Sequence, residues 1–474
     1  MSPLEWIVFL EGQLAKRQPE IEKHHRYYDA DEQVLAFAQR KFREEFGQLF
    51  TGWRDNFCGI AVDSVTERMK IDGFRWGKEP DADEQAQEIW QKNNLDAEAS
   101  QVHNDAMVAG ESFLLVWADE DDQPIITPES SREVVVHRTP GSRRKLDAAL
   151  KRYRDDWGGQ HITLWTPDQV YTSTRGVVRG SRKWTDPVAE ENPLGVVPIV
   201  PMVNKPRLHR DRNALWSDLK PIVPIQDAIT KIVADAIVAS EFAAYPQRIL
   251  SGIELPEDEN GNTIAPIQAA IDRMLLFEDE NVKWGQFSAA DLQNYCHLVD
   301  MLVMHLASIA RIPPHYFMSQ KGSSNSGESY QTKESGLGFK ITERKLHMGE
   351  GWESAMRLAF KVLEDPRAEE MSAETIWADH EYTSEGQRID ALVKLNQGLG
   401  VPQRQLWEDA GYSPQQIARF EDMQEEEFQR KLEQQKAMAE AMPQPVGPPG
   451  AQSGNQATKP QRGNSGNDNR KNAA

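Results

Sequence analysis

Residues 214–250 read ALWSDLKPIVPIQDAITKIVADAIVASEFAAYPQRIL, and residues 288–312 read SAADLQNYCHLVDMLVMHLASIARI. In both stretches apolar residues recur at helical spacing, and a proline stops the pattern. We therefore predict two long helices, one within 215–250 and one at 288–312. A polar, acidic segment at 251–287 separates them. The rest of the chain is expected to be arranged around this pair.

A Gly/Ser-rich segment, KGSSNSGES at 321–329, follows the pair and precedes a third long helical pattern. We predict a loop at 313–330 and a long helix from about Tyr330 to Leu363. The loop has the glycine spacing of a phosphate-binding loop, but Glu328 stands where such loops carry lysine. A carboxylate there would face the phosphates, so we expect no nucleotide site.

The composition limits the classes of function. The chain has 474 residues, enough for two to four domains, and a net charge of −20. A dedicated nucleic-acid binder is usually basic, because much of its affinity comes from neutralising phosphates. The acidity therefore excludes strong DNA binding by the whole surface, but it leaves open a protein past which DNA slides.

The sequence gives no sign of membrane insertion or of paired cysteines. No apolar run approaches the ~20 residues that cross a bilayer, so we expect no membrane partner. The apolar start WIVFL is short for a signal peptide and has acidic neighbours, so we expect synthesis in the cytoplasm. Cys58 and Cys296 lie in apolar helical patterns and are expected to be buried and inert.

The first 110 residues read mainly as helices. Apolar residues at helical spacing predict helices at 4–18 and 31–46. They also predict a helix near residue 60 that ends at Asp72, and two short helices within 81–110.

From Glu111 to Pro201 the period changes to that of strands. KLDAALKRYRDDW at 145–157 reads as a helix that interrupts them, and the acidic cluster Asp119–Asp122 is most simply a solvated turn. The fold class that we expect is therefore α+β and mainly helical. The strand-like runs are FLLVW (113–117), REVVVH (132–137), HITLWT (161–166), QVYTSTRG (169–176) and VVPIVP (196–201).

The C-terminal part is predicted to be helical at 384–442. Gly398 is a plausible helix C-cap, and Ser413 with Pro414 is typical of a helix start. Residues 443–474 are rich in Pro, Gly, Asn and Gln, with little to bury, so we expect a disordered tail.

Side chains that could carry catalysis do not converge in the sequence. His24 and His25 lack metal-ligand spacing, as does the triplet Asp379–Glu381, and we expect solvated surface histidines. GESFL at 110–114 lacks the second glycine of a nucleophile elbow. We therefore expect no catalytic site, no metal and no cofactor, and hence no enzyme.

Six local patterns follow one another along the chain. In order and spacing they resemble the portal proteins of long-tailed bacteriophages, over roughly residues 20–430. The patterns are NFCGIAVDSVTERMKIDGFRW (56–76), GESFL (110–114), NPLGVVPIVPMVN (192–204), EFAAYPQRIL (241–250), SIARIPPHYF (308–317) and LVKLNQGLGVPQRQLWEDAGYSPQQI (392–417).

The resemblance implies a ring of identical chains, usually twelve, at one vertex of a phage capsid. Double-stranded DNA would be packaged and ejected through the ring, with weak contacts that do not depend on sequence. The implied partners are the large terminase or packaging motor, a head-completion adaptor, and the major capsid and scaffold proteins. The protein would be part of the virion and would be assembled in the host cytoplasm.

The resemblance also divides the chain into parts. It implies a wing of helices and mixed β-structure at 1–214, a stem helix at 215–250, a small α/β clip at 251–287, a second stem helix at 288–312, a tunnel loop at 313–330, a long wing helix with its return at 331–383, a helical crown at 384–442 and a disordered tail at 443–474.

The second stem helix fits this arrangement. A helix of about 23 residues is ~35 Å long, and its apolar positions lie on more than one face. Such a helix suits packing between neighbours in a ring, although a helix buried inside one large domain is the alternative. The apolar positions are Leu292, Tyr295, Cys296, Leu298, Val299, Leu302, Val303 and Leu306.

The 254–281 segment carries eight acids and a single basic residue, Arg273, for a net charge of −7. At the tip of a ring it would repel DNA and attract a basic protein partner, although an acidic run is often only a solvated face. The residues predicted to dock a partner are Glu254, Glu257, Asp258, Glu259, Asp272, Glu278, Asp279 and Glu280.

Residues 319–345 have the opposite charge balance, a net charge of +2. A few cations repeated around a ring would follow the phosphates without holding them, although an ordinary charged helix face is the alternative. The residues predicted to contact DNA are Lys321, Lys333, Lys340, Arg344 and Lys345.

Two functions from other classes stay open at this point. A soluble metal-dependent phosphoesterase or nucleotide enzyme would need carboxylates or histidines that converge on a metal. A multi-helical adaptor protein with a disordered tail would remain small in solution.

Overall fold

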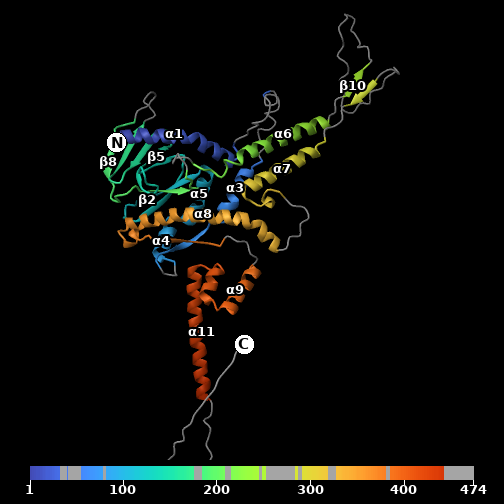
Figure 1. The fold of residues 1–474 in the computed structure, drawn as a ribbon. Coiled ribbons are helices and arrows are strands. Elements are labelled where there is room, and N and C mark those ends of the chain that lie inside the picture. The colour runs from blue at the N-terminus through green and yellow to red at the C-terminus, as the bar shows by residue number, and fades with distance from the viewer. Residues whose placement is uncertain are drawn as a thin grey trace, which may run out of the picture. The chain divides into compact units, whose positions relative to one another are not determined.

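The computed structural model describes residues 1–31, 40, 55–77, 82–175, 184–208, 215–244, 248–251, 283–286, 291–318, 327–379 and 385–441. Contacts divide the chain into two compact units, Met1–Gly411 and Tyr412–Ala474, and each is described by itself. Figure 1 shows the elements from the N-terminal helix α1 to the last helix, α11.

The N-terminal helix, α1 (Pro3–Tyr28), covers one face of a five-stranded sheet (Figure 1). A capping box at Ser2 starts the helix. Ile7, Leu10 and Leu14 lie three and four residues apart, so they share one face and are buried against the sheet.

The five-stranded sheet is an antiparallel meander in the order β4-β5-β6-β7-β8. Strand β5 (Leu146–Arg154) lies within residues 145–157, so the helix predicted there is wrong. Ala148, Ala149 and Leu150 are all buried, because apolar clusters cover both faces of the sheet. A strand covered on both faces loses its two-residue alternation and reads like a helix. The strands are β4 (Val134–Arg138), β5 (Leu146–Arg154), β6 (Gln160–Trp165), β7 (Gln169–Arg175) and β8 (Val188–Glu191).

The two short helices predicted within 81–110 are confirmed as α4 (Glu84–Lys92) and α5 (Leu95–Ala109). The helix predicted at 4–18 is part of α1. The helix predicted at 31–46 lies outside the described residues except at its first residue and at position 40.

A second sheet has three antiparallel strands in the order β3-β2-β9. The acidic cluster Asp119–Asp122 forms an exposed turn between β2 and β3, as predicted. Helix α5 enters β2 through Gly110, whose φ is +103°. A Cβ added there would lie 2.7 Å from the Trp216 amide nitrogen, so this close approach requires glycine. The strands are β2 (Glu111–Ala118), β3 (Pro124–Glu129) and β9 (Ile199–Val203).

Helix α3 (Phe57–Thr66) ends earlier than predicted. The prediction continued the helix to Asp72, but strand β1 (Ile71–Arg75) occupies that position. It pairs antiparallel with β12 (Glu374–Trp377), which is far along the chain. The residues around β1 could not reveal this pairing, because the hydrogen bonds that make β1 a strand come from β12, about 300 residues later in the chain.

The main core forms around the long helix α8 (Gly327–Val362), which confirms the third long helix predicted from the sequence. The Trp352 Nε1 donates a hydrogen bond to Nε2 of the buried His103 at 2.9 Å, and this bond links α8 to α5. Helix α8 also packs against β9 and β2, and a 3-10 turn, η3 (Pro366–Glu369), leads from it to β12. The buried positions of α8 include Leu337, Ile341, Met348 and Trp352.

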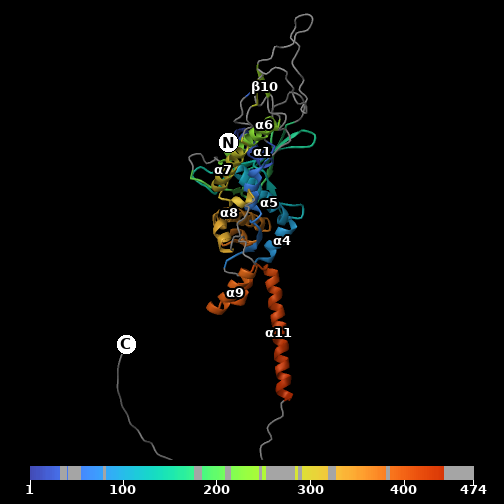
Figure 2. The ribbon, with the colours of Figure 1, turned by 90° about the vertical axis from the view of Figure 1, so that its right-hand side faces the viewer.

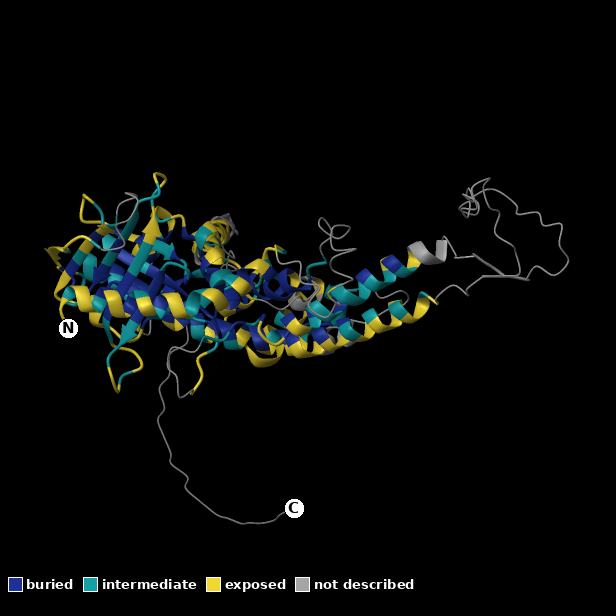
Figure 3. Cartoon of the chain, turned by 90° about the horizontal axis from the view of Figure 1, so that it is seen from above, coloured by how far each residue is buried: buried dark blue, intermediate teal, exposed yellow. Residues whose placement is uncertain are grey.

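Helices α6 (Val223–Ala244) and α7 (Gln293–Ala310) lie side by side and form a long hairpin (Figures 1 and 3). Figure 3 shows that burial along this hairpin is lower than around the main core. Helix α6 begins later than the predicted 215–250, with Pro224 in its first turn. Proline is accepted in the first turn of a helix, where its missing N–H costs no hydrogen bond within the helix.

Beyond the hairpin, β10 (Arg248–Ser251) pairs antiparallel with β11 (Lys283–Gln286). The rest of the segment predicted as a clip, at 252–282, lies outside the described residues.

The C-terminal helices predicted at 384–442 are α9 (Glu385–Leu399) and α10 (Gln403–Asp409) in the first unit and α11 (Pro414–Ala441) in the second. Helix α11 is continuous (Figure 2). Ser413 caps it as predicted, with its hydroxyl 3.4 Å from the Gln416 amide. The glycine that ends α9 is Gly400, with φ +66°, rather than the predicted Gly398. The predicted disordered tail lies outside the described residues.

The described residues confirm an α+β fold that is mainly helical. Cys58 is buried as predicted, but Cys296 is exposed on α7, so that prediction is wrong. The prediction of solvated histidines is wrong for His24 and His25, which are buried, and His380 lies outside the described residues. His24 and His25 lie near the end of α1, where the helix packs against α5 and α3.

Candidate functional site

Some of the residues predicted to contact DNA or to dock a partner lie outside the described part of the chain. The eight acidic residues at 254–280 are outside the described residues, and so is Lys321. Lys333 belongs to α8, but its side chain is likewise outside the described part. These residues stay predictions.

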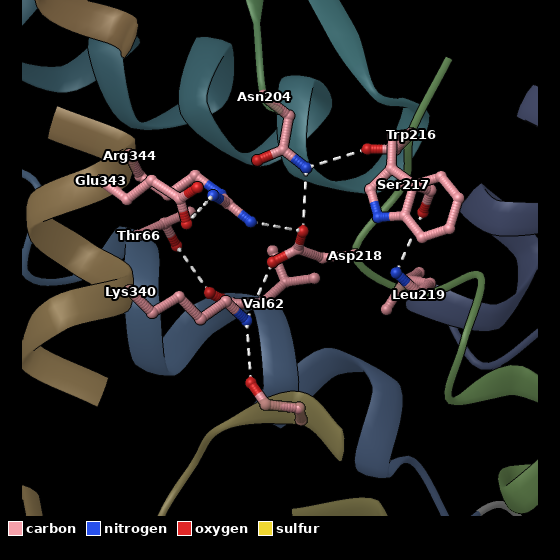
Figure 4. Close-up of polar contacts among 11 residues, drawn as sticks. Val62, Thr66, Asn204, Trp216, Ser217, Asp218, Leu219, Lys340, Glu343 and Arg344 are labelled. Carbon is pink, nitrogen blue, oxygen red and sulfur yellow. Dashed lines mark hydrogen bonds and ion pairs between the residues drawn. The ribbon is translucent and has the colours of Figure 1, made fainter. Parts of the chain in front are cut away.

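The other three predicted cations, on α8, are buried. Lys340, Arg344 and Lys345 are 6%, 2% and 7% exposed. Nζ of Lys340 lies 2.8 Å from Oδ2 of Asp218, and Nη2 of Arg344 lies 2.9 Å from Oδ1 of the same carboxylate (Figure 4). Two cations from α8 thus share one carboxylate in the segment that precedes α6.

Asp218 is also held by groups outside α8. Nδ2 of Asn204, just after β9, donates to Asp218 Oδ1 at 2.9 Å and to the Trp216 carbonyl at 3.0 Å (Figure 4). The Asp218 amide donates to the Met107 carbonyl at 3.0 Å. Burial alone would raise the pKa of Asp218, but the two cations outweigh it and hold the pKa below its usual value. The carboxylate is therefore ionised and paired.

Lys345 makes its contacts on the β12 side of α8. Its Nζ donates to the Ala378 carbonyl at 2.6 Å and lies 5.7 Å from the centroid of the Trp377 ring. Burial lowers the pKa of Lys345 to about 8, although Asp379 and Asp72 oppose this shift.

The prediction of an exposed basic strip that includes Lys340, Arg344 and Lys345 is therefore wrong. A charge count along the sequence cannot show that the charged groups are buried in contacts within the chain. The residues that this prediction missed are Asp218 and Asn204. The signal for Asp218 in the sequence is that it is the one acid among the first ten residues of the 214–250 stretch.

Helix α7 exposes large apolar side chains on one face. Leu298, Met301, Met304 and Ile309 are 39–50% exposed in the single chain. The opposite face, which includes Val303 and Leu306, is buried. Apolar residues therefore surround most of α7, as predicted. Within the described ranges no helix is both long and apolar enough to span a membrane.

The described start of the connection from α7 to α8 contacts α8 and Arg68 directly. It contains the 3-10 turn η2 (Pro314–Tyr316). Nε2 of His315 lies 3.0 Å from Oε1 of Glu334 on α8, and the Tyr316 hydroxyl donates to Oε2 of the same residue at 3.4 Å. Arg68 also donates to the Tyr316 hydroxyl. His315 and Tyr316 are thus held against α8, and residues 319–326 lie outside the described residues.

A cleft of about 380 Å³ opens beside α1 and α5. There, Nε2 of His25 lies 3.0 Å from Oδ1 of Asp105, and the Ser130 hydroxyl donates to the same oxygen at 3.2 Å. The hydroxyl is paired with the carboxylate and not with the imidazole, so this is not the Ser–His arrangement of an activated nucleophile. Among the described residues, no group of three or more His, Cys, Asp or Glu could hold a metal ion.

The sequence matches the model of a family described as phage portal protein, SPP1 Gp6-like, over residues 9–439. The chain belongs to this family of phage portal proteins. Two curated relatives are both named portal protein. The one from Mycobacterium phage L5 is 32% identical over 445 residues, which cover 89% of this chain and 88% of the relative. The one from Mycobacterium phage D29 is 32% identical over 416 residues, which cover 82% of each chain.

Three solved structures, each 12% identical, are also similar to this chain. They are the virion of a native gene transfer agent particle (TM-score 0.46, 77% of this chain and 92% of that chain), the neck of the native particle computed with C12 symmetry (0.46, 79% and 94%) and the neck of the empty particle computed with C6 symmetry (0.47, 80% and 95%). With TM-scores below 0.5 these likenesses are weak, and the family assignment rests on the sequence comparisons.

The portal family match covers nearly all of the described elements. It begins within α1 and ends near the end of α11, so it includes the described parts of both units. The resemblance seen in the sequence is thereby confirmed, and the 443–474 segment lies beyond the match.

Proposed function

We propose that copies of this phage portal protein assemble into a ring at one vertex of a capsid. Double-stranded DNA would be packaged and ejected through the ring. The observation that carries this proposal is the portal family match over residues 9–439. The protein would then be a component of the virion, assembled in the host cytoplasm.

The exposed apolar face of α7 supports assembly from identical copies. A single chain leaves Leu298, Met301, Met304 and Ile309 in contact with water. Burial of such side chains stabilises an interface by about 25 cal/mol for each Å² of apolar surface removed from water. Helices α6 and α7 would therefore stand beside those of neighbouring subunits as the stem, with about twelve copies closing the ring.

The other parts of the chain take their roles from the same proposal. The sheets and helices of 1–214, with α8 and its return at 331–383, would form the wing, and the helices of 384–442 the crown. The acidic segment 251–287 would be the clip, on which the packaging motor and later a head-completion adaptor dock. The major capsid and scaffold proteins would contact the outside of the ring.

DNA contact is now proposed for Lys321 and Lys333 alone. The buried ion pairs remove Lys340 and Arg344 from any exposed surface, and Lys345 is buried against β12. The two remaining lysines lie in or just after the predicted tunnel loop at 313–330. A few cations per subunit, repeated around the ring, would follow phosphates without holding them.

Charge reversal of these two lysines tests the proposal. We expect the double variant Lys321→Glu, Lys333→Glu to form capsids that contain the ring but little DNA, because two repulsive charges per subunit would face the phosphates. Packaged DNA is measured by nuclease protection, and ring incorporation by the protein content of purified capsids. The matched control is Lys70→Glu, at an exposed lysine between α3 and β1. Normal packaging by the double variant would remove both lysines from the proposal.

We propose no catalytic role and no cofactor for this chain. Among the described residues nothing favours the phosphoesterase or nucleotide-enzyme alternative, since the one His–Asp–Ser group found in the cleft is wrongly ordered for a nucleophile. Nothing favours the adaptor alternative over the portal family match.

A further inference from the structure

We propose that Lys340 is a positioning residue that locks the base of the α6–α7 hairpin to α8. The lock consists of the Lys340 ammonium, the Asp218 carboxylate and the Ala310 carbonyl. This inference rests on contacts within one chain, so it stands whether or not the ring proposal holds.

The Lys340 ammonium contacts both ends of the hairpin at once. On one side it lies 2.8 Å from Oδ2 of Asp218, in the segment that leads into α6. On the other side it donates to the carbonyl of Ala310, the last residue of α7, at 3.2 Å. The hairpin enters and leaves the main core through these two segments, and Figure 4 shows Lys340 on α8 beside Asp218.

The contact with α7 satisfies a specific need of that helix. The last carbonyls of a helix have no partner inside the helix, and the negative end of the helix dipole favours a cation. Helix α7 stops because Arg311 adopts a left-handed conformation with φ +58°. The amide of Arg311 then donates to Ser308 and that of Ile312 to Ala307, and Lys340 supplies the donor for Ala310.

Loss of Lys340 would release α7 while the segment before α6 stays fixed. Asp218 keeps the ion pair with Arg344 and the hydrogen bond from Asn204. The Ala310 carbonyl would lose its charged donor. Lys340 therefore sets the position of the hairpin relative to α8, and it does so at the α7 end in particular.

This lock links the hairpin to the connection that precedes α8. Residues 311–318 follow directly after Ala310, and within them His315 and Tyr316 contact Glu334 on α8. With Lys340 in place, a displacement of the hairpin is passed to α8 as a movement of one body. Without it, the hairpin can tilt while α8 stays with the main core.

The distance between labels on the hairpin and on α8 tests this inference. Cys296 is exposed in the first turn of α7 and can carry one spin label. Cys58 is buried and burial raises the pKa of its thiol to about 12, so it does not react. A second label is introduced by Glu350→Cys at an exposed position of α8. Distances are measured by electron–electron double resonance on full-length protein, with labelled chains diluted into unlabelled chains in which Cys296→Ser is present.

We expect a single narrow distance peak for the otherwise unchanged chain and loss of that peak in Lys340→Met. The matched control is Lys345→Met, which removes a buried lysine from the same helix with its contact to Ala378 but none to the hairpin. This control should keep the narrow peak. The separate variant Lys340→Arg, which retains the positive charge and the hydrogen-bond donors, should keep the narrow peak as well.

Two results would overturn the lock. One is a narrow, unshifted peak in Lys340→Met. The other is equal broadening in Lys340→Met and Lys345→Met, which would mean general loosening of the core. If Lys340→Met does not fold, Lys340→Gln replaces it, since it removes the charged donor to the Ala310 carbonyl but keeps a polar side chain beside Asp218. An unchanged peak in that variant would overturn the proposal as well.

Discussion

His103 and Asp218 are two buried polar side chains with opposite states of charge. His103 is neutral and accepts a hydrogen bond from Trp352, whereas Asp218 is ionised between two cations. Burial lowers the pKa of His103 to about 3, from a usual value of 6.5. His103 therefore takes up a proton far more readily when the main core unfolds.

The low pKa of His103 in the folded chain predicts that the protein loses stability in acid. Below pH 6.5 the unfolded chain binds a proton at His103 that the folded chain does not bind. The stabilising effect of the neutral imidazole is complete above that pH and decreases as pH falls towards 3. We expect a loss on the order of 1–2 kcal/mol between pH 6.5 and about pH 5 from this residue. Urea unfolding followed at several pH values measures it.

The variant His103→Gln keeps an acceptor for the Trp352 indole and has no proton to gain. It should be less stable than the unchanged chain at pH 7 but should show a shallower dependence on pH. His305→Gln, at an exposed position of α7, is the control and should change neither. An unchanged pH slope in His103→Gln would show that another group dominates the acid response.

At the residue scale, the sequence shows which side chains carry a charge, but it does not show which groups pack around them or whether they are buried. Lys340 and Arg344 carry their charge on a helix that was predicted, yet their partner Asp218 lies far earlier in the chain. Helical spacing shows which residues share a face, but it does not show what covers that face. The burial of His24 and His25 was missed for the same reason.

At the scale of elements, the α6–α7 hairpin was predicted from the sequence, and it exposes several large apolar side chains. Its two helices were predicted from spacing alone, because long periodic patterns with prolines at their ends are reliable signals. Strand β5 was misread as a helix, because three consecutive buried residues hide the alternation of a strand. Strands β1 and β12 were missed because each is completed by a distant partner.

The exposed face of α7 yields a prediction at this scale. The double variant Met301→Lys, Met304→Lys should fold but fail to assemble, because each copy would bring two charges into an apolar contact. Assembly is measured by native mass spectrometry and folding by circular dichroism. The control is Met371→Lys, at a methionine that is 84% exposed outside the hairpin. If the double variant forms the same assemblies as the control, α7 is not the subunit interface.

At the scale of the whole molecule, an acidic chain is consistent with a conduit for DNA. A net charge of −20 per copy gives a surface that does not hold phosphates, so DNA can pass without being trapped. The contacts proposed for Lys321 and Lys333 would be local exceptions. The family could be inferred from the order of six weak patterns, since their sequence of helix ends and strand starts is harder to produce by chance than any one of them.

The central claim is that many copies surround an open axis, and electron microscopy of the purified, full-length protein tests it most directly. End-on images should show closed rings with a central hole and a fixed number of subunits. A population of single compact particles without a hole, at concentrations where portal rings should persist, would contradict the account.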